Sequence, residues 1–177
     1  YRRLSQLAAE RGIRQRSILR VSPGIDAHTL DAISTGRNDT KFGITVENGA
    51  AMSAIEECLK LEGIDLVGLH AHIGSQIVTV DPFELLAKKM LEFSKLCTTG
   101  LGWMPRLLVF GGGLGIHYTP EDNPPPVEDL ASALVGSVRR IAKERGLETP
   151  RVGIEPGRSS TGEFGLTLYR TGPIKHV

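Results

Sequence analysis

Apolar and polar residues follow two different patterns along the chain. A helical spacing of apolar residues predicts helices over residues 1–12, 47–62, 81–100 and 130–141. In the third of these, Asp81 is the predicted N-cap, Leu96 belongs to the predicted apolar stripe, and Gly100 ends the helix. Short apolar runs between these segments predict strands at residues 17–22, 64–73, 106–110, 151–155 and 165–171. Helices and strands that alternate in this way are typical of an α/β fold with a parallel sheet.

The number of strands limits the architecture. The first four predicted strands recur every forty-odd residues, each followed by a helix or a long loop. A closed eight-stranded α/β barrel needs about 250 residues, whereas this chain has 177. The sequence therefore predicts either an open parallel sheet or one part of a barrel.

Charge and hydropathy exclude several classes of partner. The chain carries 21 Lys plus Arg against 20 Asp plus Glu, a net charge of +1. No basic field therefore favours nucleic acid or an anionic membrane surface. Purely apolar runs, such as residues 107–110, are far shorter than the ~20 residues that span a bilayer. We expect neither a nucleic-acid nor a membrane partner, so any anionic ligand must be bound by local chemistry.

The two cysteines and the chain ends bear on localisation. Cys58 and Cys97 fall in predicted helices, without the close spacing of a metal site or a redox pair. We expect reduced core thiols in a cytoplasmic protein. The chain begins at Tyr1 without a methionine and ends within apparent structure, so we expect the natural termini to lie elsewhere, and a leader upstream of Tyr1 would escape notice.

Three polar clusters follow successive predicted strands, at the edge where parallel α/β folds place their sites. The first, residues 68–76, contains His70 and His72, which strand alternation puts on one face with Gly68, opposite Val67, Leu69, Ala71 and Ile73. Two such imidazoles can stack on a planar cofactor, bind zinc, or be ordinary hydrogen-bonded core residues. Further zinc ligands would have to come from His117 or His176, which are weakly placed, so we rank metal below cofactor stacking.

The other two clusters favour an anionic ligand. Gly111, Gly112 and Gly113 follow an apolar strand, and they form either a tight turn or a nest of backbone N–H groups for a phosphate. Glu155 and Arg158 flank a Pro-Gly turn, and they could also form no more than a surface ion pair. Together the clusters suit a phosphorylated heteroaromatic cofactor such as pyridoxal phosphate. The long irregular segment 23–40, which follows the first strand, is also a candidate functional loop.

The motifs resemble one family in order along nearly the whole chain. They are Arg20-Val-Ser-Pro-Gly-Ile-Asp-Ala-His-Thr29, Ile33-Ser-Thr-Gly36, Lys41-Phe-Gly43, His70-Ala-His-Ile-Gly-Ser-Gln76, Gly111-Gly-Gly-Leu-Gly-Ile116 and Glu155-Pro-Gly-Arg-Ser159. This series resembles the ornithine, arginine and diaminopimelate decarboxylases that use pyridoxal phosphate, and its Asp-Ala-His-Thr and His-Ile-Gly-Ser-Gln forms resemble the diaminopimelate branch.

The resemblance implies an alanine-racemase-like enzyme with an eight-stranded α/β barrel followed by a β domain. Residues 1–177 would be the C-terminal part of the pyridoxal-phosphate barrel, without its N-terminal strands and without the β domain. The implied reaction converts meso-diaminopimelate to L-lysine and carbon dioxide in lysine biosynthesis. The implied catalytic residues are Glu155, which pairs with the pyridine nitrogen, and His72, which stacks on the ring. The implied phosphate contacts are Ser75, Gly111, Gly112 and Gly113. Gly157 is a further implied cofactor contact, and Arg158 would meet either the phosphate or the substrate carboxylate.

The same resemblance implies what this chain lacks. The family's cofactor-binding lysine lies upstream and its proton-donating cysteine lies in the β domain, so neither Lys41 nor Cys58 nor Cys97 takes those roles, and Lys41 resembles a dimer-contact or structural residue. We expect a homodimer with shared active sites, an amino-acid substrate and no turnover by residues 1–177 alone. The alternatives are a decarboxylase of another basic amino acid, a catalytically silent regulatory homologue, and a zinc-dependent barrel hydrolase using His70 and His72.

Overall fold

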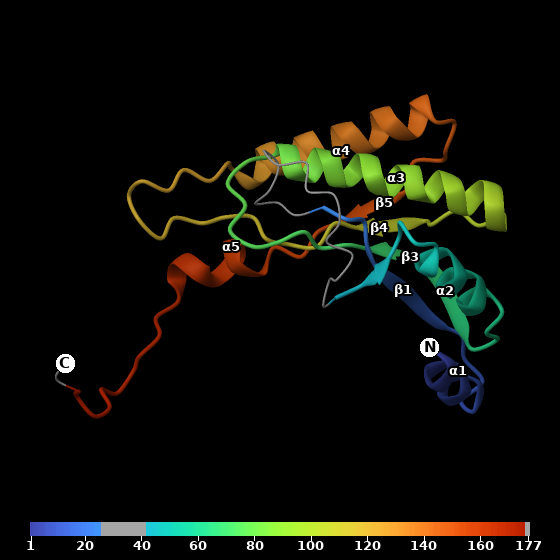
Figure 1. The fold of residues 1–177 in the computed structure, drawn as a ribbon, viewed down its shortest axis with the longest axis horizontal. Helices are drawn as coiled ribbons and strands as arrows, with labels where there is room; N and C mark the ends of the chain where they lie inside the picture. Colours follow the sequence, from blue (N-terminus) through green and yellow to red (C-terminus); the bar gives the residue numbers. More distant parts are fainter. Residues whose placement is uncertain (26–41, 176–177) are drawn as a thin grey trace.

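The alternating segments fold into a five-stranded sheet in the computed structural model, which describes residues 1–25 and 42–175 (Figure 1). Its strand order is β2-β1-β3-β4-β5, and every neighbouring pair is parallel. The strands are β1 (Gln15–Ser22), β2 (Ile44–Thr45), β3 (Ile64–His70), β4 (Leu107–Val109) and β5 (Arg151–Gly153). The predicted α/β class with a parallel sheet is confirmed. Most of the candidate loop 23–40, together with Lys41 and His176, lies outside the described residues.

Helices accompany the sheet. They are α1 (Arg2–Ala9), α2 (Ala50–Leu59), α3 (Asp81–Leu101), α4 (Val127–Glu144) and α5 (Gly157–Thr161), with a short 3₁₀ helix at Gly162–Phe164. Among them, α2, α3 and α4 pack on the sheet through a continuous apolar core. The two longest, α3 and α4, lie side by side over the sheet (Figure 1). Leu69 of β3, Leu108 of β4 and Leu91 of α3 are buried within this core. None of the helices in the described part of the chain combines the length and apolarity that crossing a membrane requires.

Helix α3 follows its predicted stripe with two corrections. The helix begins at Asp81 after an N-cap at Val80, and it ends before Gly102, which has a φ of 63°, so Asp81 is not the N-cap and Gly100 is not the stop. Leu96, which we had placed on the apolar stripe, is 56% exposed. The buried stripe passes instead through Ser94 and Cys97, because these residues continue the three-to-four-residue spacing from Met90 and Leu91.

Strand β3 is shorter than predicted, and a bulge shifts its alternation. The strand ends at His70 rather than Ile73, although the N–H of Ala71 still donates to the carbonyl of Val109. The register against β1 shifts between Ser17 and Ile18. As a result Leu66 joins Leu69 in the main core whereas Val67 does not. An inserted residue reverses which side chains face the helices on one side of the bulge, so the predicted face is correct from Leu69 onward only.

The predicted strand at residues 165–171 is wrong for this structure. Residues 165–171 are extended but unpaired, and they run away from the sheet (Figure 1). Phe164, Leu166 and Leu168 are 88%, 93% and 90% exposed. The alternation of apolar residues fits a strand, but a strand also needs a neighbour to receive its hydrogen bonds. The fifth strand of the sheet is instead the two-residue β2, which sequence reasoning missed.

Both cysteines are buried and free of disulfides, which agrees with the expectation of core thiols. Cys97 lies on the inner face of α3, and burial raises the pKa of its thiol to about 12. Burial also raises the pKa of Cys58. Neither thiol is therefore prepared to act as a nucleophile or proton donor.

Candidate functional site

The three predicted clusters meet at the carboxyl ends of β3, β4 and β5. The glycine turn, residues 111–113, lies between the segments that follow β3 and β5. Its Gly111 carbonyl accepts a hydrogen bond from the N–H of Glu155 at 2.7 Å, and its Gly113 carbonyl accepts one from Ile77 at 2.8 Å. Parallel strands end at one edge of a sheet, so side chains distant in sequence gather there.

A direct contact joins the first cluster to the third. Nε2 of His70 lies 3.0 Å from Oε2 of Glu155. The His70 side chain is 10% exposed, whereas the Glu155 side chain is 57% exposed. The pair therefore runs from the interior of the sheet to its open edge, where the carboxylate can meet a ligand.

His72 is held as a neutral imidazole. The backbone N–H of Gly112 donates to its Nδ1 at 3.3 Å, and a protonated Nδ1 could not accept that bond. Partial burial lowers the pKa of His72 below its ordinary 6.5, with further lowering from Arg20 and His70, while Glu155 opposes the shift. A neutral, flat ring on an exposed residue suits packing against a planar ligand.

We predict that His72 in the cofactor-free, full-length protein titrates at a pH below 6.5. The folded protein then takes up this proton at a lower pH than the unfolded chain does, so His72 lowers the stability as the pH falls below about 6.5. NMR of histidine-labelled protein measures the midpoint, and the His72→Asn variant assigns the signal. A midpoint at or above 6.5 would contradict this electrostatic picture.

Close backbone contacts account for the glycines of the turn. Gly111 and Gly113 have φ values of 66° and 99°, which side chains disfavour. A Cβ on Gly112 would overlap the carbonyl oxygen of Glu155, and one on Gly113 would overlap that of Gly74. Within the described residues, the N–H groups of Gly111 and Gly113 have no hydrogen-bond partner. The glycines therefore allow close backbone packing, and they leave two backbone N–H groups able to bind a ligand.

Gln76 is a structural residue of the site to which sequence reasoning gave no role. Its side-chain amide donates to the carbonyl of Ile116 at 2.6 Å, and its Oε1 accepts from the N–H of the same residue at 3.3 Å. Its φ of 56° is the one positive value among the described residues other than glycine. Gln76 thus fixes the loop that carries Ser75, which is itself exposed. The sequence signal that could have indicated this role is a polar residue directly after Gly74-Ser75.

Arg158 lies on α5, directly after the Pro-Gly turn, and Tyr118 holds it. Its guanidinium donates to the Tyr118 hydroxyl at 2.8 Å and lies 5.7 Å from the centroid of that ring. Asp122 accepts from the N–H groups of Tyr118 and Thr119, both at 2.8 Å. These hydrogen bonds lower the pKa of Asp122. Sequence reasoning missed Tyr118, because nothing in the pattern places this loop beside α5.

Hydrogen bonds therefore connect part of the predicted set of site residues. His70, His72, Glu155 and the glycine turn form one connected group, while Gly157 and Arg158 follow on α5 and Ser75 lies in the neighbouring loop. Residues 1–25 and 42–175 contain no group of three or more His, Cys, Asp or Glu that could hold a metal ion. His117 is exposed and outside the connected group.

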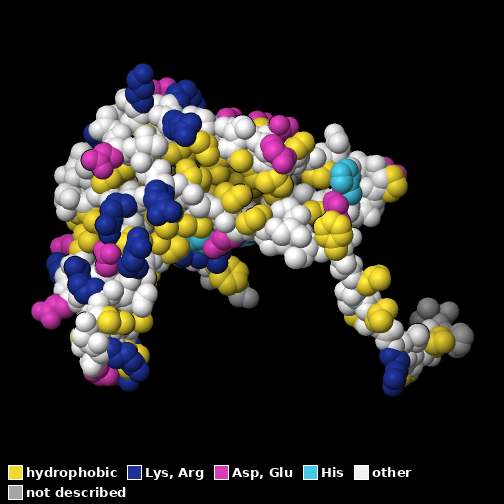
Figure 2. All heavy atoms as spheres, turned by 180° about the vertical axis from the view of Figure 1, so that it is seen from behind, with side chains coloured by type: hydrophobic (Ala, Val, Ile, Leu, Met, Phe, Trp, Pro, Cys, Tyr) yellow, Lys and Arg dark blue, Asp and Glu magenta, His cyan; other side chains and the backbone are white. Residues whose placement is uncertain are grey.

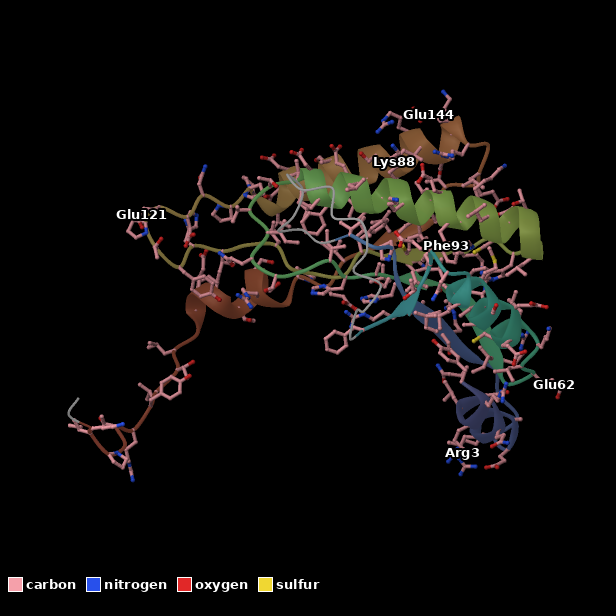
Figure 3. The ribbon with its side chains drawn as sticks, in the orientation of Figure 1. Arg3, Glu62, Lys88, Phe93, Glu121 and Glu144 are labelled. Atoms are coloured by element: carbon pink, nitrogen blue, oxygen red, sulfur yellow. The ribbon has the colours of Figure 1, made fainter. Side chains whose placement is uncertain are left out.

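Lys88 and Glu144 lie on the two long helices, and Glu121 lies at the tip of the loop before α4 (Figure 3).

Solved structures with a similar fold include diaminopimelate decarboxylases. The enzyme from M. jannaschii matches with a TM-score of 0.77 and 35% identity, over 88% of this chain and 35% of its own. The Helicobacter pylori enzyme complexed with L-lysine matches with a TM-score of 0.69 and 28% identity, over 88% of this chain and 36% of its own.

Curated relatives agree with the structural matches. The diaminopimelate decarboxylase of Mycobacterium bovis is 42% identical over 99% of this chain, and that of Bacillus methanolicus is 38% identical over 98%. The chain spans about 40% of the length of each. A family model described as "Pyridoxal-dependent decarboxylase, pyridoxal binding domain" matches residues 2–162. The chain therefore belongs to the pyridoxal-dependent decarboxylase family, within the pyridoxal binding domain.

Proposed function

We propose that the longer protein containing this chain is a pyridoxal-phosphate enzyme that converts meso-diaminopimelate to L-lysine and carbon dioxide. The observation that carries the proposal is identity of 38–42% to diaminopimelate decarboxylases over 98–99% of the chain. L-Lysine, the product of this reaction, is bound in the related structures from M. jannaschii and Helicobacter pylori.

The residues of the site fit the cofactor. The free N–H groups of Gly111 and Gly113 are suited to a phosphate, as bare backbone nests are. Ser75 adds a hydroxyl from the neighbouring exposed loop, and Gly112 fixes the turn by its bond to His72. His72 offers a neutral ring face, and Glu155 offers an exposed carboxylate.

The chemistry supplied by bound pyridoxal phosphate is storage of the electron pair left when carbon dioxide departs. Glu155 would keep a proton on the ring nitrogen, because an adjacent carboxylate favours the cationic form. His72 would pack against the ring and hold its orientation. Gly157 begins α5, and Arg158, the next residue, can present a two-pronged donor to phosphate or to the substrate carboxylate.

The chain's place in the larger fold is also a proposal. We infer that residues 1–177 form the C-terminal part of a pyridoxal-phosphate α/β barrel, with the remaining strands and a β domain supplied by other parts of the protein. Two observations support this: among the described residues the sheet ends at β2 on one side and at β5 on the other, and hydrophobic side chains form a broad patch across the middle of the molecule (Figure 2). A large exposed apolar patch normally marks a surface that another protein segment or a partner contacts. We further propose a homodimer with shared active sites.

The proposed function is tested with the full-length protein, pyridoxal phosphate and meso-diaminopimelate. We expect carbon dioxide and L-lysine in equal amounts, and no release from ornithine, arginine or L-lysine at the same concentration. Release from one of those amino acids alone would transfer the activity to another decarboxylase of basic amino acids. Cofactor binding without turnover of any of them would favour a silent homologue. Residues 1–177 by themselves are expected to be inactive, since the cofactor-binding lysine is not among their motifs.

A further inference from the structure

His70 is the one member of the connected group without a role in the proposed function. It is buried at the end of β3, and Nε2 of its ring lies 3.0 Å from Oε2 of Glu155, 85 residues later. Burial of a polar ring is costly unless its hydrogen bonds are made. The bond to Glu155 meets that need, so the two residues are structurally interdependent.

Strand register explains how His70 reaches across β4. His70 pairs with Val109, and Val109 pairs with Gly153, so these three residues form one row across the sheet. Two residues farther along the three segments come His72, Gly111 and Glu155. Gly111, in the middle of this second row, has no side chain, and a Cβ there would lie 2.7 Å from Nδ1 of His72. The missing side chain leaves open the space between the histidines and the carboxylate.

The chemistry of the contact assigns the direction of the hydrogen bond. An ionised carboxylate only accepts, so His70 must donate from Nε2. This bond occupies Oε2 of Glu155, and within the described residues Oε1 has no hydrogen-bond partner. Donation to one oxygen fixes the rotation of the carboxylate. Because the Glu155 side chain is 57% exposed, its second oxygen remains available at the open edge.

We propose that His70 is a positioning residue that fixes the Glu155 carboxylate through Oε2, so that Oε1 is presented to the ring nitrogen of the cofactor. The inference rests on the proposed function only in taking pyridoxal phosphate as the ligand. The two histidines of the motif therefore have different roles: His72 contacts the ring face, and His70 acts through Glu155.

The test measures equilibrium binding to the full-length apoprotein with two ligands. One is pyridoxal phosphate, and the other is its analogue in which C–H replaces the ring nitrogen. We expect His70→Leu to weaken pyridoxal phosphate binding about tenfold, the size of one lost charge-assisted hydrogen bond, and to change analogue binding less than about twofold. His70→Gln, which keeps a donor near the position of Nε2, is expected to restore most of the affinity. His117→Gln, at an exposed histidine outside the connected group, is the matched control.

Equal weakening of both ligands by His70→Leu would overturn the proposal, because it would show a general structural role. Unchanged binding of pyridoxal phosphate would overturn it as well. If His70→Leu fails to fold by circular dichroism, His70→Gln is compared with His70→Asn, whose shorter amide cannot reach Glu155, and the same ligand-dependent loss is expected for Asn. A wild-type protein that binds neither ligand would refute the proposed cofactor and the positioning role together. The variants could also show the expected binding pattern while the wild-type protein fails to decarboxylate meso-diaminopimelate. That result would refute the proposed substrate but not the positioning role of His70.

Discussion

Replacing Glu155 with Gln is expected to lower kcat for carbon dioxide release by about 10²–10³-fold, the range for loss of one preorganised electrostatic contact. The substitution keeps the size of the side chain, and its amide oxygen can still accept from His70. Its other end, however, becomes an N–H donor, which favours an unprotonated ring nitrogen. Steady-state assay of the full-length protein measures the effect, and KM is expected to change much less than kcat.

Glu148→Gln is the matched control, because Glu148 is an exposed carboxylate in the loop before β5, at the opposite end of the strand from Glu155. It should retain wild-type kcat. Cofactor content is measured in parallel by absorbance, so that loss of chemistry is separated from loss of cofactor. If Glu155→Gln kept more than about a third of wild-type kcat at full cofactor content, Glu155 would not control the ring nitrogen.

Local pattern was sufficient to predict that the clusters at 68–76, 110–116 and 155–159 meet. Each cluster follows a strand, and a parallel α/β sheet brings strand ends to one edge. Pattern also placed His70 and His72 on one face. It could not predict that His70 contacts Glu155 while His72 contacts Gly112, since these contacts depend on rotamers and on register across β4. The roles of the individual residues toward the cofactor stay predictions.

The errors in the fold have a shared physical origin. The apolar alternation at 165–171 and the position of Leu96 were read as local signals, whereas strand pairing and burial depend on what lies opposite. Leu96 falls beside the stripe that meets the sheet, so it is exposed. The two residues of β2 are too few to show a period, and only pairing of Val21 with Ile44 and of Ser22 with Thr45 makes them a strand. The bulge beside Val67 likewise has no sequence signature, because it is defined by the partner strand.

Replacing Gly113 with Ala is expected to lower the free energy of unfolding of the full-length protein by about 2–4 kcal/mol, as strain and overpacking in a closely packed site do. Two separate causes act here. The φ of 99° is disfavoured by any Cβ, and that Cβ would overlap the backbone oxygen of Gly74, which a side-chain rotation cannot relieve. The turn must then move, carrying its free N–H groups with it. Affinity for pyridoxal phosphate is expected to fall at least tenfold, and urea titration and equilibrium binding measure the two effects.

Gly146→Ala separates the two causes. Gly146 also has a positive φ, 61°, but nothing lies within 4 Å of the position of its Cβ, so only the backbone cost of about 1 kcal/mol applies. Its loop, between α4 and β5, is at the other end of the strands from the site, so cofactor affinity should not change. Equal destabilisation by both substitutions would mean that the contact with Gly74 contributes nothing. A Gly113→Ala protein that is destabilised yet binds pyridoxal phosphate normally would mean that the glycine turn serves packing alone and that the phosphate is held elsewhere.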